Sequence, residues 1–165
     1  MAGKQDFSPE DWAKLVGSSL FSSVAISAAE PSGLWGTLQE GYANASSIFR
    51  DSQNETPLVT EVVATSMTSQ GRQLAQDALK TRISGIPREA IVAACVAALD
   101  DVSRVLDAKA AEDAAGFKAW LRANAVAVAE AASEGGFLGF GGEKVTEHER
   151  ATLEQIDAAL GLATV

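Results

Sequence analysis

Residues that carry chemistry are scarce in this chain. Its 165 residues include one cysteine, Cys95, and one histidine, His148. A single cysteine can form neither an intrachain disulfide nor a zinc site of several thiolates. Cys95 lies on an apolar stripe and is expected to be a buried, unreactive thiol, whereas His148 lies among glutamates and is expected to be solvated. No pattern brings a nucleophile to a histidine, so we expect no enzymatic activity.

Long apolar runs and clustered positive charges are also missing. No run approaches the ~20 apolar residues that cross a bilayer, and the first residues lack the apolar core of a signal peptide. The net charge of -9 argues against nucleic acid and anionic membranes as partners. We therefore expect a soluble, cytoplasmic protein without membrane insertion. Its acidity either maintains solubility or attracts a basic partner or a divalent cation.

Strand signals are nearly absent, whereas helix signals recur along the chain. The sequence shows no sustained alternation of apolar and polar residues and no Asn-Gly or Asp-Gly hairpin turn. No linker rich in proline, serine or glycine divides it. We predict an all-α, single-domain bundle of about six helices over residues 1–165, with residues 1–7 flexible. Apolar stripes at helical spacing place these helices at about 8–30, 38–49, 58–83, 87–108, 111–133 and 146–160.

Cap residues indicate where several of these helices begin and end. Ser8 is a good N-cap for the first helix, and Thr146 with Glu149 forms a capping-box pattern at the start of the last. Gly161 is expected to end that last helix. Gly71 interrupts the stripe of the third helix and predicts a kink there.

Two glycine-rich turns resemble each other. We call residues 31–36, PSGLWG, the first elbow, and residues 135–142, GGFLGFGG, the second elbow. Each follows an alanine-rich helix end with one acid, and this echo favours two helix–turn–helix units about a pseudo-twofold axis. The apolar elbow residues either cover the end of the core or form an exposed docking patch. They are Trp35, Phe137, Leu138 and Phe140.

Glutamates gather around both elbows. Carboxylate oxygens suit hard cations such as calcium or magnesium. The spacing of an EF-hand loop and the Glu-x-x-His pattern of di-iron bundles are both missing, however. These acids therefore either cap helices and stay solvated or hold a divalent metal. The candidate ligands are Glu134, Glu143, Glu147 and Glu149 around the second elbow, and Glu30 before the first.

The C-terminal part of the chain resembles a known family. Residues 127–136, AVAEAASEGG, and residues 143–162, EKVTEHERATLEQIDAALGL, are similar to the helix–loop–helix of tellurite-resistance-B-like domains. In those domains an alanine-rich helix ends in Ala-Asp-Gly, and a Val-Ser/Thr-x-x-Glu pattern starts the next. Here Ser133-Glu134-Gly135 replaces Ala-Asp-Gly and the loop is longer. The resemblance implies a helical bundle of this size, a role in stress responses and acids proposed to bind metal.

Three functional hypotheses remain open. The first is a non-enzymatic helical module that binds a protein partner or itself, stress-associated as the resemblance implies. The second is a small domain that binds a divalent metal through the elbow acids and needs no other cofactor. The third is an enzyme or carrier whose helices enclose a cavity for a small apolar ligand, gated by Tyr42 and Asn124. Asn124 interrupts the apolar stripe of its helix, so it is expected either to be hydrogen-bonded between helices or to contact a ligand.

Overall fold

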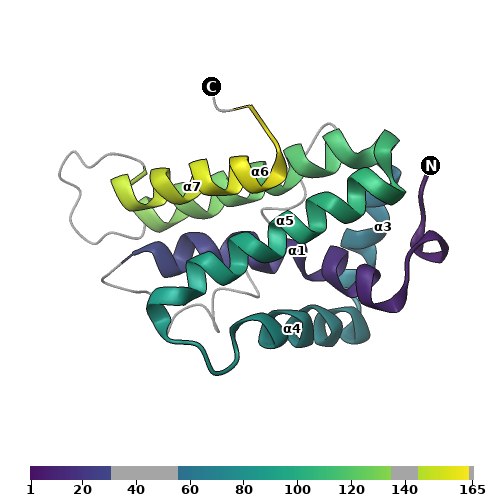
Figure 1. Ribbon diagram of the computed structural model, residues 1–165, viewed down its shortest axis with the longest axis horizontal. Coiled ribbons are helices and arrows are strands. Elements are labelled where there is room, and N and C mark those ends of the chain that lie inside the picture. Colours follow the sequence, from purple (N-terminus) through teal and green to yellow (C-terminus); the bar gives the residue numbers. More distant parts are fainter. Residues whose placement is uncertain (31–55, 135–144, 164–165) are drawn as a thin grey trace.

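The helices follow the apolar stripes of the sequence. The computed structural model describes residues 1–30, 56–134 and 145–163. These residues form six α-helices and no strand, which confirms the all-α prediction (Figure 1). The predicted helix at 38–49 and most elbow residues, including Trp35, Phe137, Leu138, Phe140 and Glu143, lie outside the described residues. The helices are α1 (Pro9–Ala29), α3 (Pro57–Ser66), α4 (Ser69–Ile83), α5 (Ile91–Lys109), α6 (Ala111–Glu134) and α7 (Glu147–Leu160), with short 3-10 turns η1 (Lys4–Asp6) and η4 (Arg88–Ala90).

Helix α1 lies at the centre of the bundle and contacts each of the other five described helices (Figure 1). From residue 15 to residue 26 every position except Ser19 is buried. A small residue lets α4 approach closely: a methyl group added at Gly17 would lie 3.1 Å from Ala78 Cβ of α4. The helix that contacts the most described neighbours is thus one that is rich in glycine, alanine and serine.

Buried serines of α1 bond to their own helix. Ser18 Oγ donates to the Leu15 carbonyl oxygen at 2.7 Å, and Ser23 Oγ donates to the Ser19 carbonyl oxygen at 2.9 Å. Such bonds to the preceding turn satisfy a hydroxyl without a partner on another helix. Serine can therefore be buried here at little cost in unpaired polar groups.

The predicted helix caps are confirmed. Ser8 Oγ accepts from the backbone N–H of Asp11 at 3.1 Å, and α1 ends at Ala29. Thr146 and Glu149 form both bonds of the capping box, and Gly161 ends α7 in the left-handed region with a φ of 68°. These boundaries depend on local backbone groups, which is why the sequence indicates them well.

The prediction of one long third helix with a kink at Gly71 is wrong. The helix stops at Ser66, and a new one starts after Thr68, whose Oγ1 accepts from the Gly71 backbone N–H at 2.9 Å. A Cβ at Gly71 would lie 1.8 Å from the Thr65 carbonyl oxygen. Because glycine has no Cβ, Gly71 lets the backbones of α3 and α4 approach closely at this tight helix–helix turn.

The first seven residues make contacts with the bundle, and their expected flexibility stays a prediction. The Phe7 side chain is 8% exposed, and its ring centroid lies 6.0 Å from that of Trp12. The backbone N–H of Ala2 donates to Asp113 Oδ2 at 3.2 Å. An apolar ring that extends the core and a buried carboxylate that accepts a backbone bond hold this segment in place.

We expect Gly71→Ala to lower the free energy of unfolding by about 1–3 kcal/mol, because the added methyl group meets the Thr65 carbonyl oxygen. Without this contact, alanine would stabilise the helix by about 1 kcal/mol relative to glycine. A decrease in the free energy of unfolding would therefore show that the methyl group meets the Thr65 carbonyl oxygen. Urea unfolding followed by circular dichroism measures it.

The matched control is Gln70→Ala, at an exposed position one residue earlier. It should change the free energy of unfolding by less than about 0.5 kcal/mol. An equal loss in the two variants, or a gain in Gly71→Ala, would contradict the close-approach explanation.

Candidate functional site

The residues that flank the two elbows meet at one end of the bundle, where α1 and α6 end and α7 begins (Figure 1). Glu30 directly precedes the first elbow, and Thr146 lies shortly after the second. Thr146 Oγ1 donates a short hydrogen bond to Glu30 Oε1. From η4, Arg88 Nη2 donates to the Glu30 backbone carbonyl oxygen at 3.0 Å. We call Glu30, Thr146 and Glu149 the elbow junction.

One threonine holds two carboxyl groups at this junction. Thr146 Oγ1 donates to Glu30 and accepts from the Glu149 backbone N–H at 3.2 Å. The Glu149 side chain folds back, so that its Oε2 accepts from the Thr146 backbone N–H at 2.9 Å. Only 1% of Glu149 is exposed. The sequence predicted this glutamate as a helix cap, and the cap also buries its carboxyl group beside Glu30.

Burial changes the acidity of Glu149. Removal from water disfavours the charged carboxylate and is the largest cause that raises its pKa above the ordinary value of 4.5. The negative charge of Glu30 raises this pKa further, while the hydrogen bonds from Thr146 oppose both effects. Glu149 therefore holds its proton to a higher pH than a solvated glutamate does.

The predicted metal ligands are only partly brought together. Glu30 and Glu149 meet at the junction, whereas Glu147 is exposed in the first turn of α7. Glu134 is the last residue of α6, but its side chain and Glu143 lie outside the described residues. The described part of the chain contains no group of three or more His, Cys, Asp or Glu arranged to hold a metal ion.

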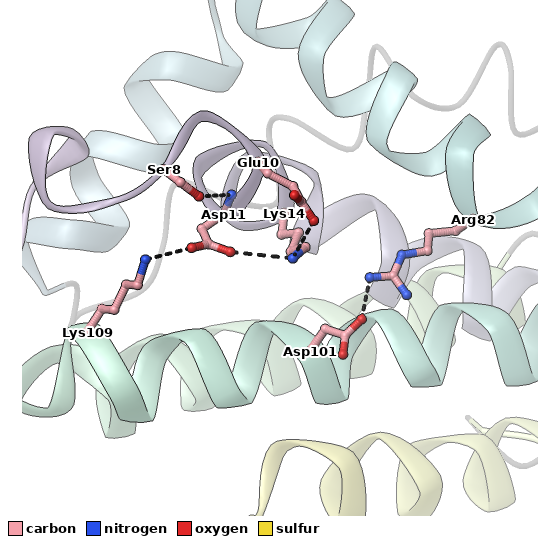
Figure 2. A network of polar contacts seen from close by, with 7 residues as sticks. All are labelled: Ser8, Glu10, Asp11, Lys14, Arg82, Asp101 and Lys109. Atoms are coloured by element: carbon pink, nitrogen blue, oxygen red, sulfur yellow. Dashed lines mark hydrogen bonds and ion pairs between the residues drawn. The ribbon is translucent and has the colours of Figure 1, made fainter.

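A second network of polar contacts ties the start of α1 to α5 (Figure 2). Asp11 accepts from Lys109 Nζ at 2.8 Å and from Lys14 Nζ at 3.4 Å. The hydrogen bond from Lys109 is the main cause that lowers the pKa of Asp11 below 3.8, and burial opposes it. Nearby, Arg82 of α4 pairs with Asp101 of α5. These carboxylates already have cationic partners within the chain, which favours a structural role.

The other candidate groups of the sequence do not belong to the elbow junction. Cys95 is fully buried, and burial raises the pKa of its thiol to about 12. His148 is exposed, as expected. Asn124 is 5% exposed, yet its Nδ2 has no hydrogen-bond partner within the described residues, so the expected tie through this amide nitrogen is not found there. Tyr42 lies outside the described residues.

The contact between Glu30 and Thr146 was not predicted, because it joins residues 116 positions apart. The available signal was the echo between the elbows, which suggested that their flanks could converge. No family model, curated protein or solved structure matches the chain. Among the described helices, none combines the length and apolar character needed to span a membrane.

We expect Cys95 in the folded chain to react with iodoacetamide about a thousandfold more slowly than in the urea-unfolded chain at pH 8. The reason is that only the thiolate reacts, and the pKa of this thiol rises from 9.0 to about 12 on burial. Mass spectrometry after timed quenching measures both rates. Similar rates in the two states would show that the thiol is accessible and ordinary in acidity.

Proposed function

We propose that this chain is a non-enzymatic interaction module that binds a cationic side chain of a partner protein at the elbow junction. The supporting observation is the placement of Glu149, a carboxyl group 1% exposed beside the second carboxyl of Glu30. Burying an acid next to another acid opposes folding. Groups perturbed in this way gather at functional sites more often than elsewhere.

A comparison with another buried acid supports a cationic partner. Asp157 is 4% exposed and accepts from Arg122 Nε at 2.8 Å, so the chain supplies its counter-charge. Within the described residues, Glu149 forms no ion pair with lysine or arginine, and its carboxyl accepts from a backbone N–H. A lysine or arginine from a partner would supply at the junction what Arg122 supplies to Asp157.

The resemblance of residues 127–162 to tellurite-resistance-B-like domains supports the wider description of a stress-associated module. In this proposal the apolar elbow residues Trp35, Phe137, Leu138 and Phe140 form the apolar part of the interface. An interface that combines aromatic anchors with a few charged groups is typical of protein–protein recognition. The partner is either another protein or a second copy of this chain.

Binding of a lysine-rich peptide, followed by NMR titration of backbone amides, tests this proposal. We expect the shifts to gather at Thr146 and Glu149, and Glu30→Gln or Glu149→Gln to weaken binding by about threefold to tenfold. The same peptide with acetylated lysines should not bind, because acetylation removes the positive charge.

The matched control is Glu112→Gln. This substitution removes the same charge from an exposed position at the start of α6, far along the helix from the junction. If it weakens binding as much as Glu30→Gln, the peptide responds to the net charge of -9 and the junction is not the site.

A divalent-metal site is the second candidate, and the meeting of two carboxyl groups on Thr146 favours it. Its further ligands would come from Glu134, Glu143 and Glu147. We expect calorimetry with calcium, magnesium, manganese and zinc to show heat for one of them, with at least about tenfold weaker binding in Glu149→Gln. The absence of heat and of a thermal shift with all four ions would remove this candidate.

A further inference from the structure

We propose that α4 is a lid on the bundle, which undocks from α1 and α5 as a unit while the other described helices stay folded. The ion pair between Arg82 of α4 and Asp101 of α5 is its clasp. Undocking uncovers the part of α1 around Gly17, which α4 covers in the closed bundle. The inference goes beyond the proposed function, because none of these contacts belongs to the elbow junction.

Helix α4 lies at the edge of the bundle, below α1 in the view of Figure 1. Two of its fifteen residues, Gly71 and Ala75, are buried, against seven of the nineteen residues of α5. Its three large apolar side chains, Leu74, Leu79 and Ile83, are only partly buried. Because the free energy gained on burial scales with the apolar area removed from water, α4 is held less firmly than the helices around the core.

Small residues form the contact between α4 and α1 at Gly17. A Cβ added there would lie 3.1 Å from Ala78 Cβ and 3.6 Å from the Ala75 carbonyl oxygen. These small groups fit closely but bury little apolar area. The separation of α4 from α1 at this point therefore costs less than the removal of a large side chain from the core.

One ion pair fastens the far end of α4 to α5. Arg82 lies in the last turn of α4 and donates from Nη2 to Asp101 Oδ2, and Figure 2 shows this guanidinium reaching across to α5. Within the described part of the chain, no other side-chain hydrogen bond or ion pair joins α4 to another helix. The two side chains are 26% and 39% exposed, so water can compete for the pair.

The connection that follows α4 gives the helix room to move. Gly85 has a φ of 77°, and a Cβ at this position would meet no atom within 4 Å. Residues 84–87 loop away from the bundle in Figure 1. A glycine in open space can change its backbone angles without a clash. The end of α4 can therefore leave α5 while η4 and the start of α5 stay in place.

Undocking also exposes the backbone of α4 to hydrogen exchange. A helix of fifteen residues is marginal in water without tertiary packing. Once α4 leaves α1, its backbone hydrogen bonds open and its amide hydrogens exchange with solvent. The exchange of amides in the middle of α4 therefore reports the open lid.

Hydrogen exchange of the full chain, followed by NMR and corrected for intrinsic rates, tests the lid. The probe is the amide of Ala75 on α4, and the references are the amides of Leu99 and Val102 on α5, all three at buried positions. We expect Ala75 to exchange at least about tenfold faster than both references. Low concentrations of urea should accelerate the references more than Ala75, because complete unfolding exposes more surface than the release of one helix.

Two variants test the clasp from its two sides. Arg82→Gln and Asp101→Asn should each accelerate exchange at Ala75 by about twofold to fivefold, the effect of a partly exposed ion pair. Because both substitutions break the same contact, the double variant should exchange no faster at Ala75 than the faster single variant does.

The matched control is Ile156→Val, which removes one buried methyl group from α7, a helix on the other side of α1 from α4 (Figure 1). This contact persists when the lid opens. Exchange at Leu99 should therefore accelerate by about twofold to tenfold, and exchange at Ala75 by less than about twofold. The lid is overturned if Ala75 and the references exchange at equal rates, if both clasp variants leave Ala75 unchanged, or if Ile156→Val accelerates Ala75 and Leu99 equally.

Discussion

Helix α1 is enclosed by the other five described helices, and this enclosure limits what its sequence can contain. Bulky side chains on every face of α1 would push the neighbouring helices apart, while charged side chains would be buried away from water at a high cost in free energy. Leucine, valine and phenylalanine are therefore interleaved with glycine, alanine and serine along α1. At Gly17 the absence of a side chain lets α4 approach closely, because a Cβ there would lie 3.1 Å from Ala78 Cβ.

The two ends of α1 meet different electrostatic surroundings. At its start, Asp11 lies beside Lys109 and Lys14, and the pKa of this carboxyl is lowered. Beyond its end, Glu30 meets the hydroxyl of Thr146 and lies near Glu149, whose pKa is raised. One end is thus stabilised by the charges of the chain itself, and the other keeps two acids together. This difference singles out the elbow junction within a bundle that is otherwise built from ordinary packing.

The sequence predicted the local features of this fold more successfully than its long-range contacts. Ser8, Thr146 and Gly161 indicated helix ends, because a cap depends on backbone groups a few residues away. The break at Thr68 was missed, since a threonine within an apolar stripe reads equally well as a helix interior or as a cap. The contact between Glu30 and Thr146 depends on how α1 and α7 are placed, and apolar periodicity fixes a helix face without fixing which residues of two helices meet.

The buried serines of α1 affect how the position of this helix against its neighbours is fixed. Ser18 and Ser23 direct their hydroxyl hydrogens to carbonyl oxygens of α1 itself, so they give no directional bond to a neighbouring helix. Along its buried length, α1 forms no side-chain hydrogen bond to another described helix, and steric fit holds it against them. Sliding or rotation of such a helix is resisted by steric fit and by the polar contacts at its two ends. The polar contacts at the two ends of α1 therefore fix its position along the helix axis, because the serine hydroxyls in its buried middle form no directional bond to a described neighbour.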